Sequence, residues 1–327
     1  MVLSRTILAM VFLAIPALAE RPWIDQKRVP ESRDDLKEIQ QLMQAALPRA
    51  RAATVCIQLG QGSGSGVIVS EDGLIMTAAH VTGGVGHAFS VIFEDGREVK
   101  AESLGLNSET DAALAKIVEP GKYPYVELAR DGEEAKLGDW VFALGHSGGF
   151  DKERGVVFRP GRIVRTTTST IQSDCNLIGG DSGGPLFDLN GKLVGIHSRV
   201  GAKLPENMHV PTREFLRAWD ELNKSEFLGE GPFAEKPEVG KAFLGIHVEA
   251  REAGGVEIKR VGRESPAEKA GMKAGDVILS IDGQPLPDRK TLQDWLATKA
   301  PDEQVAFEML RDGSSETLTL RLGDRDA

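Results

Sequence analysis

Short apolar segments separated by turn residues dominate the middle of the chain. Between Thr54 and about Val210, apolar runs recur between Gly, Asp and Asn turns. The runs lie at 67–70, 74–78, 89–93, 112–117, 140–144, 161–164, 184–187 and 193–197. Many short strands at this spacing are typical of a β-sandwich or β-barrel. The pattern therefore predicts a mostly β domain.

Helical spacing replaces this pattern on both flanks. In 31–46, apolar residues recur at helical spacing beneath a charged face, at Leu36, Ile39, Leu42 and Met43. Two interpretations of this helix stay open: it packs on the β domain, or it contributes to an oligomer contact. A second helix, predicted over 211–223, ends the β domain.

Beyond residue 223 the composition changes. Residues 224–240 combine two Pro and three Gly with several charges, which predicts a linker. After it, the apolar run 243–248 predicts a strand. Ser-Pro at 265–266 followed by Gly271 predicts a short helix, and 275–283 predicts another strand flanked by turns.

The first residues have the layout of a secretory signal peptide. Arg5 precedes the apolar run 7–15, and the small-residue site Ala17-Leu18-Ala19 follows it. A retained membrane anchor is the alternative, but the run is shorter than the roughly 20 residues that span a bilayer. The sequence therefore predicts a signal peptide at 1–19 and a mature protein that is periplasmic or secreted.

Length and charge narrow the class of protein. With 327 residues, and about 150 residues per domain, two domains are expected. The 37 glycines and four tryptophans fit a loop-rich, mostly β chain. The net charge of −10, without a cluster of Lys and Arg, argues against nucleic acid as a partner.

The two cysteines, Cys56 and Cys175, could pair in an oxidising compartment. Two separately buried thiols are the favoured alternative, because free Cys is among the most buried residue types. The cysteines form no C-x-x-C motif, and the six histidines show no H-E-x-x-H spacing. We therefore expect no metal site and no cofactor.

Three separated segments carry the candidate chemistry. Thr77-Ala78-Ala79-His80 comes first, Thr110-Asp111-Ala112 second, and Gly180-Asp181-Ser182-Gly183-Gly184-Pro185 last. Each segment alone has an ordinary interpretation, as a core histidine, a turn aspartate and a glycine turn. Together they have the order His, Asp, Ser that serine peptidases of the chymotrypsin type use. The sequence predicts a catalytic triad of His80, Asp111 and Ser182.

The glycines around the serine fit the same chemistry. An oxyanion hole needs backbone N–H groups aimed at one point, and Gly180 can adopt the dihedrals this requires. We expect the N–H groups of Gly180 and Ser182 to hold the oxyanion.

Three further segments carry a family resemblance. Residues 64–73, 110–117 and 137–145 read GSGVIVSEDG, TDAALAKI and LGDWVFALG. They resemble the HtrA (DegP-like) serine proteases, in which a trypsin-like double β-barrel precedes one or two PDZ domains. The resemblance implies a chymotrypsin-like double β-barrel followed by a small α+β PDZ domain.

The resemblance also implies domain boundaries. We expect an N-terminal helical segment at 20–47, a protease domain at 48–223, a linker at 224–240 and a PDZ domain at 241–327. Family members are often trimers built through their N-terminal regions, which implies a homotrimer or larger homo-oligomer.

A function follows from the same resemblance. The chain would be an extracytoplasmic endopeptidase for unfolded or misfolded proteins, whose PDZ domain binds peptide C-termini. The alternative is a latent or inactive protease fold that serves as a scaffold or chaperone and binds peptides.

Substrate-binding residues are carried over by their offset from Ser182. Asn176 is expected near the base of the specificity pocket, and Ile196, His197 and Ser198 on the strand that pairs with substrate. Since no carboxylate stands at the pocket base, small or medium apolar side chains are the expected substrates. His197 is interpreted as an ordinary surface histidine, with pH sensitivity as the alternative.

The last domain resembles a PDZ domain of the bacterial protease type. By position, Leu244, Gly245 and Ile246 would supply the N–H groups that capture a peptide carboxylate. Leu292, with Trp295 and Leu296, would wall the groove, and core packing is the alternative for that helix. Ala242-Phe243 stands where many such loops carry Gly before the apolar residue.

Asp181 departs from the resemblance, since the HtrA pattern usually has Asn before the serine. In trypsin this Asp receives a new N-terminal ammonium, and this chain lacks an Ile-Val-Gly-Gly start before Thr54. We expect Asp181 to pair with a basic side chain, Arg165 or Arg199, or to stay solvated.

Overall fold

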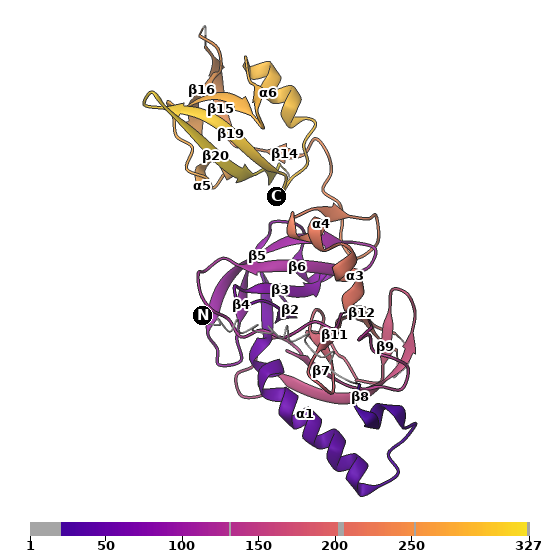
Figure 1. Cartoon of the computed structure of the whole chain (residues 1–327). Coiled ribbons are helices and arrows are strands. Elements are labelled where there is room, and N and C mark those ends of the chain that lie inside the picture. Colours follow the sequence, from indigo (N-terminus) through magenta and orange to yellow (C-terminus); the bar gives the residue numbers. More distant parts are fainter. Residues whose placement is uncertain (1–20, 131, 202–205, 252, 326–327) are drawn as a thin grey trace, which may run out of the picture.

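The structure is a computed structural model that describes residues 21–325 except 131, 202–205 and 252. The predicted signal peptide at 1–19 lies outside the described residues. Among the helices of the described part, none is long and apolar enough to cross a membrane. The prediction of a mostly β chain is confirmed, and Figure 1 shows two β-barrels below a smaller C-terminal domain.

Six strands form the first barrel. They are β1 (Thr54–Leu59), β2 (Gly62–Ile68), β3 (Leu74–Ala78), β4 (Ala88–Ile92), β5 (Glu98–Asn107) and β6 (Ala112–Ile117). Their order is β5-β4-β1-β2-β3-β6, and antiparallel pairing of β5 with β6 closes the barrel. Within these strands buried and exposed positions alternate most clearly along β4 and β5, as expected of a sheet with one solvated face.

The second barrel is also closed. Its strands are β7 (Trp140–Gly145), β8 (Val157–Thr166), β9 (Ile171–Ser173), β10 (Pro185–Asp188), β11 (Leu193–Val200) and β12 (Asn207–Pro211). A continuous apolar cluster joins the two barrels, and the stacked rings of Phe142 and Phe187, 5.2 Å apart, lie within it. The two barrels therefore share one tightly packed core.

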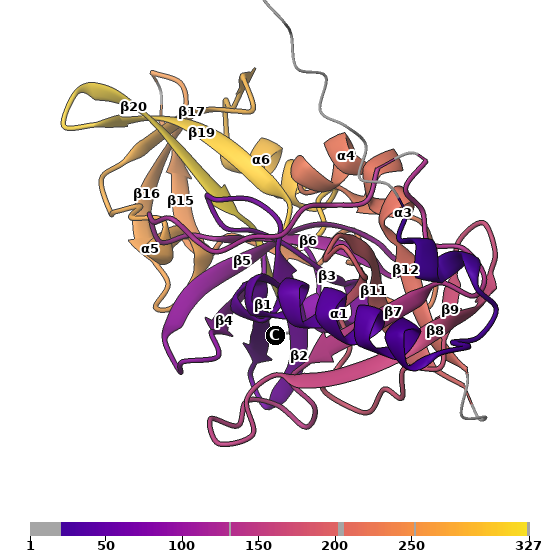
Figure 2. The ribbon, with the colours of Figure 1, turned by 60° about the horizontal axis from the view of Figure 1, so that its bottom comes forward.

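The N-terminal helix packs on this core. Helix η1 (Trp23–Gln26) is followed by α1 (Arg33–Ala53). Ser32 caps the N-terminus of α1, since its side chain accepts a hydrogen bond from the N–H of Asp35. Figure 2 shows α1 lying along the barrels, and its Ile39 and Met43 are buried there. The helix extends beyond the predicted 31–46 and continues to Ala53. It passes through Pro48, which has no backbone N–H to donate to the helix.

Short helices complete the two-barrel body. They are α2 (Ala79–Thr82), α3 (Thr212–Arg217) and α4 (Trp219–Asn223). The helix predicted over 211–223 is thus two helices, because Ala218 leaves the helical conformation.

The C-terminal domain has its own core. It contains β14 (Ala242–Phe243), β15 (Ile246–Ala250), β16 (Val256–Val261), α5 (Pro266–Lys269), β17 (Val277–Ile281), β18 (Gln284–Pro285), α6 (Arg289–Leu296), β19 (Gln304–Arg311), β20 (Ser314–Arg321) and β21 (Gly323–Asp324). The main sheet has the order β15-β16-β17-β19-β20, so β15 is an edge strand. Its apolar cluster is separate from that of the barrels.

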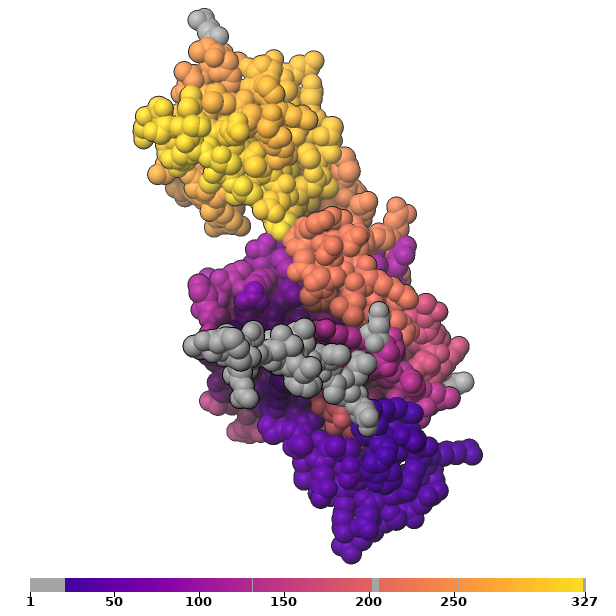
Figure 3. All heavy atoms as spheres, viewed as in Figure 1, coloured from indigo at the N-terminus to yellow at the C-terminus, as the bar shows by residue number. Residues whose placement is uncertain are grey.

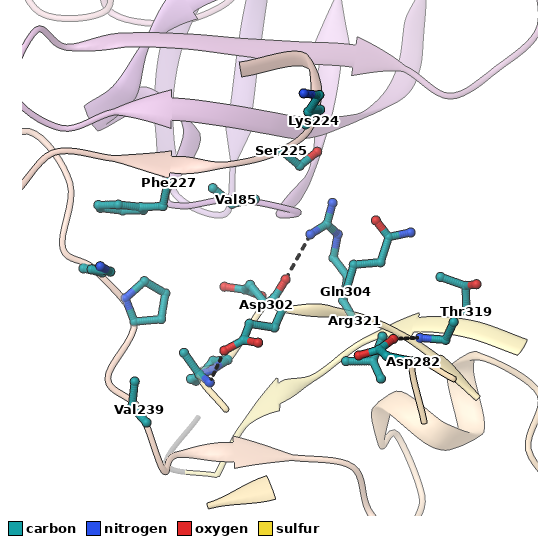
Figure 4. A pocket seen from close by; sticks show the side chains of 17 residues that line it. Val85, Lys224, Ser225, Phe227, Val239, Asp282, Asp302, Gln304, Thr319 and Arg321 are labelled. Carbon is teal, nitrogen blue, oxygen red and sulfur yellow. Dashed lines mark hydrogen bonds between the residues drawn. The ribbon is translucent and has the colours of Figure 1, made fainter. Parts of the chain in front are cut away.

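A polar contact joins the two parts of the chain, although Figure 3 shows the C-terminal domain as a distinct lobe. His87 Nε2 lies 3.1 Å from Asp302 Oδ2, and Arg321 Nε donates to Glu102 Oε1 at 2.9 Å. Figure 4 shows Val85 and Phe227 facing Asp302 and Arg321 across a cavity of about 610 Å³.

This contact depends on pH through His87. The hydrogen bond to Asp302 raises the pKa of His87 above its ordinary 6.5. The protonated pair therefore stabilises the contact fully below pH 6.5, and that stabilisation is lost as the pH rises through the raised pKa. Limited proteolysis of residues 234–240 should accelerate from pH 6 to pH 9.

Asp302→Asn should abolish most of this pH dependence, because it removes the charge that favours protonated His87. Asp312→Asn, at an exposed hairpin position of the same domain, is the matched control. Equal pH dependence in both variants would contradict the assignment to the His87–Asp302 pair.

Candidate active site

Strand pairing brings two of the predicted triad residues together. In the first barrel β3 pairs with β6, and Ala78 stands opposite Ala112. His80 follows β3 on α2, and Asp111 directly precedes β6. His80 and Asp111 are therefore neighbours in space, although β4 and β5 lie between them in the sequence.

The loop before β6 presents Asp111 in an unusual backbone conformation. Asp111 has φ 66°, a left-handed value that Asp tolerates better than most residues. The side chain of Asn107 accepts hydrogen bonds from the N–H groups of Glu109 and Thr110 at 2.9 and 3.1 Å, and Asn107 O accepts from Asp111 N at 3.0 Å. This turn fixes the aspartate before any substrate arrives.

The Asp111 carboxylate is fully buried and multiply bonded. His80 Nδ1 lies 3.0 Å from each carboxylate oxygen, and the His80 N–H donates to Oδ1 at 3.2 Å. Ser198 Oγ donates to Oδ2 at 2.5 Å. The carboxylate thereby keeps the proton of the imidazole on Nδ1 and leaves Nε2 as the free acceptor.

Ser182 lines the same cavity as His80. This cavity, of about 190 Å³, lies against the first barrel and is completed by Ile57, Leu59, Gly62, Ser63, Gly64 and Val81. Among the described residues, no hydrogen bond joins His80 Nε2 to Ser182 Oγ. His80 and Ser182 thus border one cavity without a hydrogen bond between their side chains.

Backbone hydrogen bonds fix the loop that carries Ser182. Its carbonyl accepts from Ser65 N at 2.7 Å, and Gly183 N donates to His197 O at 2.7 Å. Gly183 has φ +83°, and a Cβ there would lie 2.2 Å from Ser65 O. Glycine is therefore required where the loop crosses the first barrel.

Gly180 also occupies a position that excludes a side chain. It has φ +91°, and a Cβ would lie 2.5 Å from Gly148 N. Among the described residues, no acceptor bonds the N–H of Gly180 or of Ser182. Both donors are available to a substrate oxygen, and the oxyanion hole stays a prediction.

Asp181 forms a buried ion pair with a residue that the sequence did not indicate. Arg159 Nη2 lies 3.1 Å from Asp181 Oδ2, Ser147 Oγ donates to Oδ1 at 2.7 Å, and the carboxylate is buried. The expected partners Arg165 and Arg199, and a solvated Asp181, were wrong. The pairing of β7 with β8 brings Arg159 opposite Ala143, behind the serine loop.

The comparisons with known proteins agree with this geometry. Residues 64–196 match the family of trypsin-like peptidase domains, and residues 242–322 match the PDZ domain family. A Rhizobium meliloti protein described as a probable periplasmic serine endoprotease DegP-like is 31% identical over 271 residues, covering 80% of this chain and 53% of that protein.

The chain belongs to the HtrA/DegP-like serine proteases. A Marinomonas relative with the same description is 34% identical over 289 residues, covering 82% of this chain and 59% of that protein. The crystal structure of a serine endoprotease from Yersinia pestis superimposes with a TM-score of 0.50 at 25% identity, covering 90% of this chain and 99% of that one. The chain spans little more than half the length of these curated relatives.

The residues predicted to bind substrate in this HtrA-like protease lie in different environments. Ser198 donates a hydrogen bond to Asp111, and Ile196 is fully buried in the barrel core. Asn176 is exposed between β9 and β10. Its role at the pocket base stays a prediction.

His197 belongs to a buried relay, so its interpretation as a surface histidine was wrong. Its Nδ1 lies 2.9 Å from His209 Nδ1, its Nε2 lies 3.1 Å from Leu144 O, and Ser173 Oγ lies 2.7 Å from His209 Nε2. A carbonyl only accepts, so His197 carries its proton on Nε2 and accepts at Nδ1. His209 then donates from Nδ1 and accepts from Ser173.

Burial disfavours the charged form of both imidazoles. It lowers the pKa of His197 to about 3 and lowers that of His209 as well. Protonation of His197 on Nδ1 would also place this N–H against the Nδ1–H of His209. No pattern in the sequence indicated His209, Ser173 or Arg159, because only strand register brings these residues to their partners.

The two cysteines are separate thiols, as the favoured alternative predicted. Cys56 and Cys175 are free and buried in different barrels. Desolvation raises the pKa of each to about 11, so neither is a reactive thiolate. Within the described part of the chain, no cluster of His, Cys, Asp and Glu could hold a metal ion.

The predicted PDZ residues gather where edge strand β15 begins. Gly245 has φ +82°, and a Cβ would lie 2.2 Å from Ser265 Cβ, so glycine is required there. Leu244 is buried in the domain core, Ile246 opens β15, and Leu292 on α6 is also buried. Core packing, the alternative for Leu292, thus describes its contacts. Carboxylate capture by this loop stays a prediction.

The relay makes a prediction about stability. His209→Phe should lower the free energy of unfolding by about 1–3 kcal/mol, because it leaves the buried Nδ1 of His197 without a donor. The double variant His197→Leu/His209→Phe should cost less than the two single changes added together, since it removes both polar partners. Urea unfolding at pH 7 measures this.

The exposed His247→Phe is the control, and it should leave the unfolding midpoint unchanged. Because the folded-state pKa of His197 lies below 6.5, wild-type stability should also fall as the pH drops from 6.5 toward 3, and less so in the double variant. Additive costs would contradict the relay.

Proposed function

We propose that this chain is a serine endopeptidase that hydrolyses peptide bonds in unfolded or misfolded proteins. The observation that carries the proposal is the buried Asp111, bonded to His80 Nδ1, beside a cavity that His80 and Ser182 share. The family membership of both domains supports it.

The chemistry follows the roles of a triad. Ser182 Oγ attacks the substrate carbonyl while His80 Nε2 removes the hydroxyl proton. Asp111 holds the imidazole tautomer and stabilises the imidazolium that forms. The N–H groups of Gly180 and Ser182 receive the developing oxyanion. His80 then gives the proton to the leaving amine, and water repeats the sequence to release the acyl group.

Since His80 and Ser182 are not bonded in this state, a small rearrangement must precede attack. Rotation of the Ser182 side chain toward Nε2 is the smallest such movement, because the loop backbone is fixed at Ser65 and His197. Hydrogen bonds at active sites commonly tighten only with substrate bound.

The PDZ domain would bind peptide C-termini. Its β15 is an edge strand with α6 packed beside it, an arrangement that accepts an added strand from an extended peptide. Leu244, Gly245 and Ile246 would receive the terminal carboxylate. The relatives described as periplasmic support the same compartment, or secretion, after removal of 1–19.

We also propose that the chain assembles into a homotrimer or a larger homo-oligomer. Leu36 on α1 is 57% exposed and Trp23 is 47% exposed, and both lie in the N-terminal region, through which members of the family often assemble. These side chains remain uncovered in one copy of the chain.

A latent scaffold or chaperone is the second candidate. The observation that favours it is the missing bond between His80 and Ser182 among the described residues. Fluorophosphonate labelling of Ser182 distinguishes the candidates, because labelling requires an activated hydroxyl and an open oxyanion hole.

Removal of triad groups should have very different effects from removal of an ordinary serine. Ser182→Ala should lower turnover of casein by on the order of 10⁶ and Asp111→Asn by about 10⁴, the latter through the wrong imidazole tautomer. Initial rates of fluorescent casein cleavage measure both.

Ser315→Ala, at an exposed position of β20, should leave the rate unchanged. Equal activity of wild type and Ser182→Ala would refute the enzyme. Peptide binding without labelling or cleavage would favour the scaffold.

A further inference from the structure

The segment predicted as a linker is partly a component of the protease. Strand β13 (Phe227–Leu228) joins the first barrel in parallel beside β5, with Phe227 opposite Leu106 and Leu228 opposite Asn107. Figure 1 shows this segment running along the upper side of the barrel before it reaches the C-terminal domain. The free linker therefore begins later than residue 224.

The same segment is bonded to the loop that presents the catalytic aspartate. Leu228 O accepts from Ser108 N at 2.8 Å, Gly231 N donates to Ser108 Oγ at 3.0 Å, and Phe233 N donates to Ser108 O at 3.1 Å. Ser108 is fully buried. These bonds fix the path of residues 228–233 relative to Asp111.

Gly231 permits this close approach. A Cβ at this position would lie 2.3 Å from Ser108 O and 2.5 Å from Glu109 Cα, and both are backbone atoms that cannot move aside. The contact is thus built into the sequence rather than formed by flexible side chains.

This anchoring places Phe233 beside the catalytic base. Its ring centroid lies 6.5 Å from that of His80, with the rings inclined at 41°. The guanidinium of Arg199 lies 5.2 Å from the Phe233 ring centroid. Phe233 also packs on an apolar cluster that includes Ala79 and Val85, so its position is well supported.

Phe233 lies near His80 but is not among the residues that line the Ser182 cavity. The cavity is lined by β1 and β2 residues, whereas Arg199 follows Ser198 on β11, the strand expected to pair with substrate. Successive side chains of an extended peptide point to opposite sides. If the residue before the scissile bond enters the specificity pocket, the one before that faces His80, Phe233 and Arg199.

We propose that Phe233, supplied by the interdomain segment, is a specificity-determining residue that favours an apolar side chain two positions before the cleaved bond. This inference rests on the proposed function. The aromatic ring offers an apolar surface, and the imidazole edge borders it. Burying an aliphatic substrate side chain against this ring would favour binding, because it removes apolar surface from water. Glycine has no side chain to bury and would gain no such binding energy.

The experiment compares two fluorogenic peptides that differ only by Val or Gly at this position. Phe233→Ala should lower kcat/KM for the Val peptide on the order of tenfold, mainly through KM, and leave the Gly peptide within about twofold. Phe233→Leu should restore most of the loss. The exposed Glu235→Ala in the same segment is the matched control.

A second measurement separates this inference from the proposed function. In a Ser182→Ala background, binding of the Val and Gly peptides is measured by fluorescence anisotropy, without turnover. Loss of the Val preference on adding Phe233→Ala supports the subsite even if the parent chain proves to be inactive. Equal losses for both peptides, or no loss for either, would overturn it.

Discussion

The buried carboxylate of Asp111 is the constraint on which the rest of the site depends. An anion with no exposed surface is costly unless hydrogen bonds replace its lost water. Here the replacements come from His80 in the first barrel and from Ser198 in the second. The same hydrogen bonds also orient the imidazole of His80 and connect the two barrels at this point.

A second buried carboxylate, that of Asp181, is also stabilised by polar partners and precedes Ser182 in the chain. Asp181 is held by Arg159 and Ser147, and its neighbours Gly180 and Gly183 adopt backbone conformations that ordinary residues rarely tolerate. The serine loop thus lies between one buried ion pair and one neutral histidine relay. Removing one partner from either network would leave an unpaired polar group in the core, so both networks favour a single loop geometry.

The boundary between the two domains is less sharp than their separate cores indicate. The segment after α4 contributes β13 to the barrel and a ring beside His80 before it leads to the C-terminal domain. The pairs His87–Asp302 and Glu102–Arg321 add a second contact between the first barrel and the C-terminal domain. The first contact ends beside His80, and the second joins the C-terminal domain to His87 and Glu102 of the first barrel.

Sequence alone determined the β-rich body, the small second domain and the candidate triad, because strand periodicity, turn residues and the Gly-rich serine motif are local signals. It also indicated two separate buried thiols. The tertiary structure decided which groups complete the networks: Arg159 rather than Arg165 or Arg199, the His197–His209 pair, and Phe233. These choices depend on strand register and barrel closure, which bring distant residues together and leave no periodic trace in the chain.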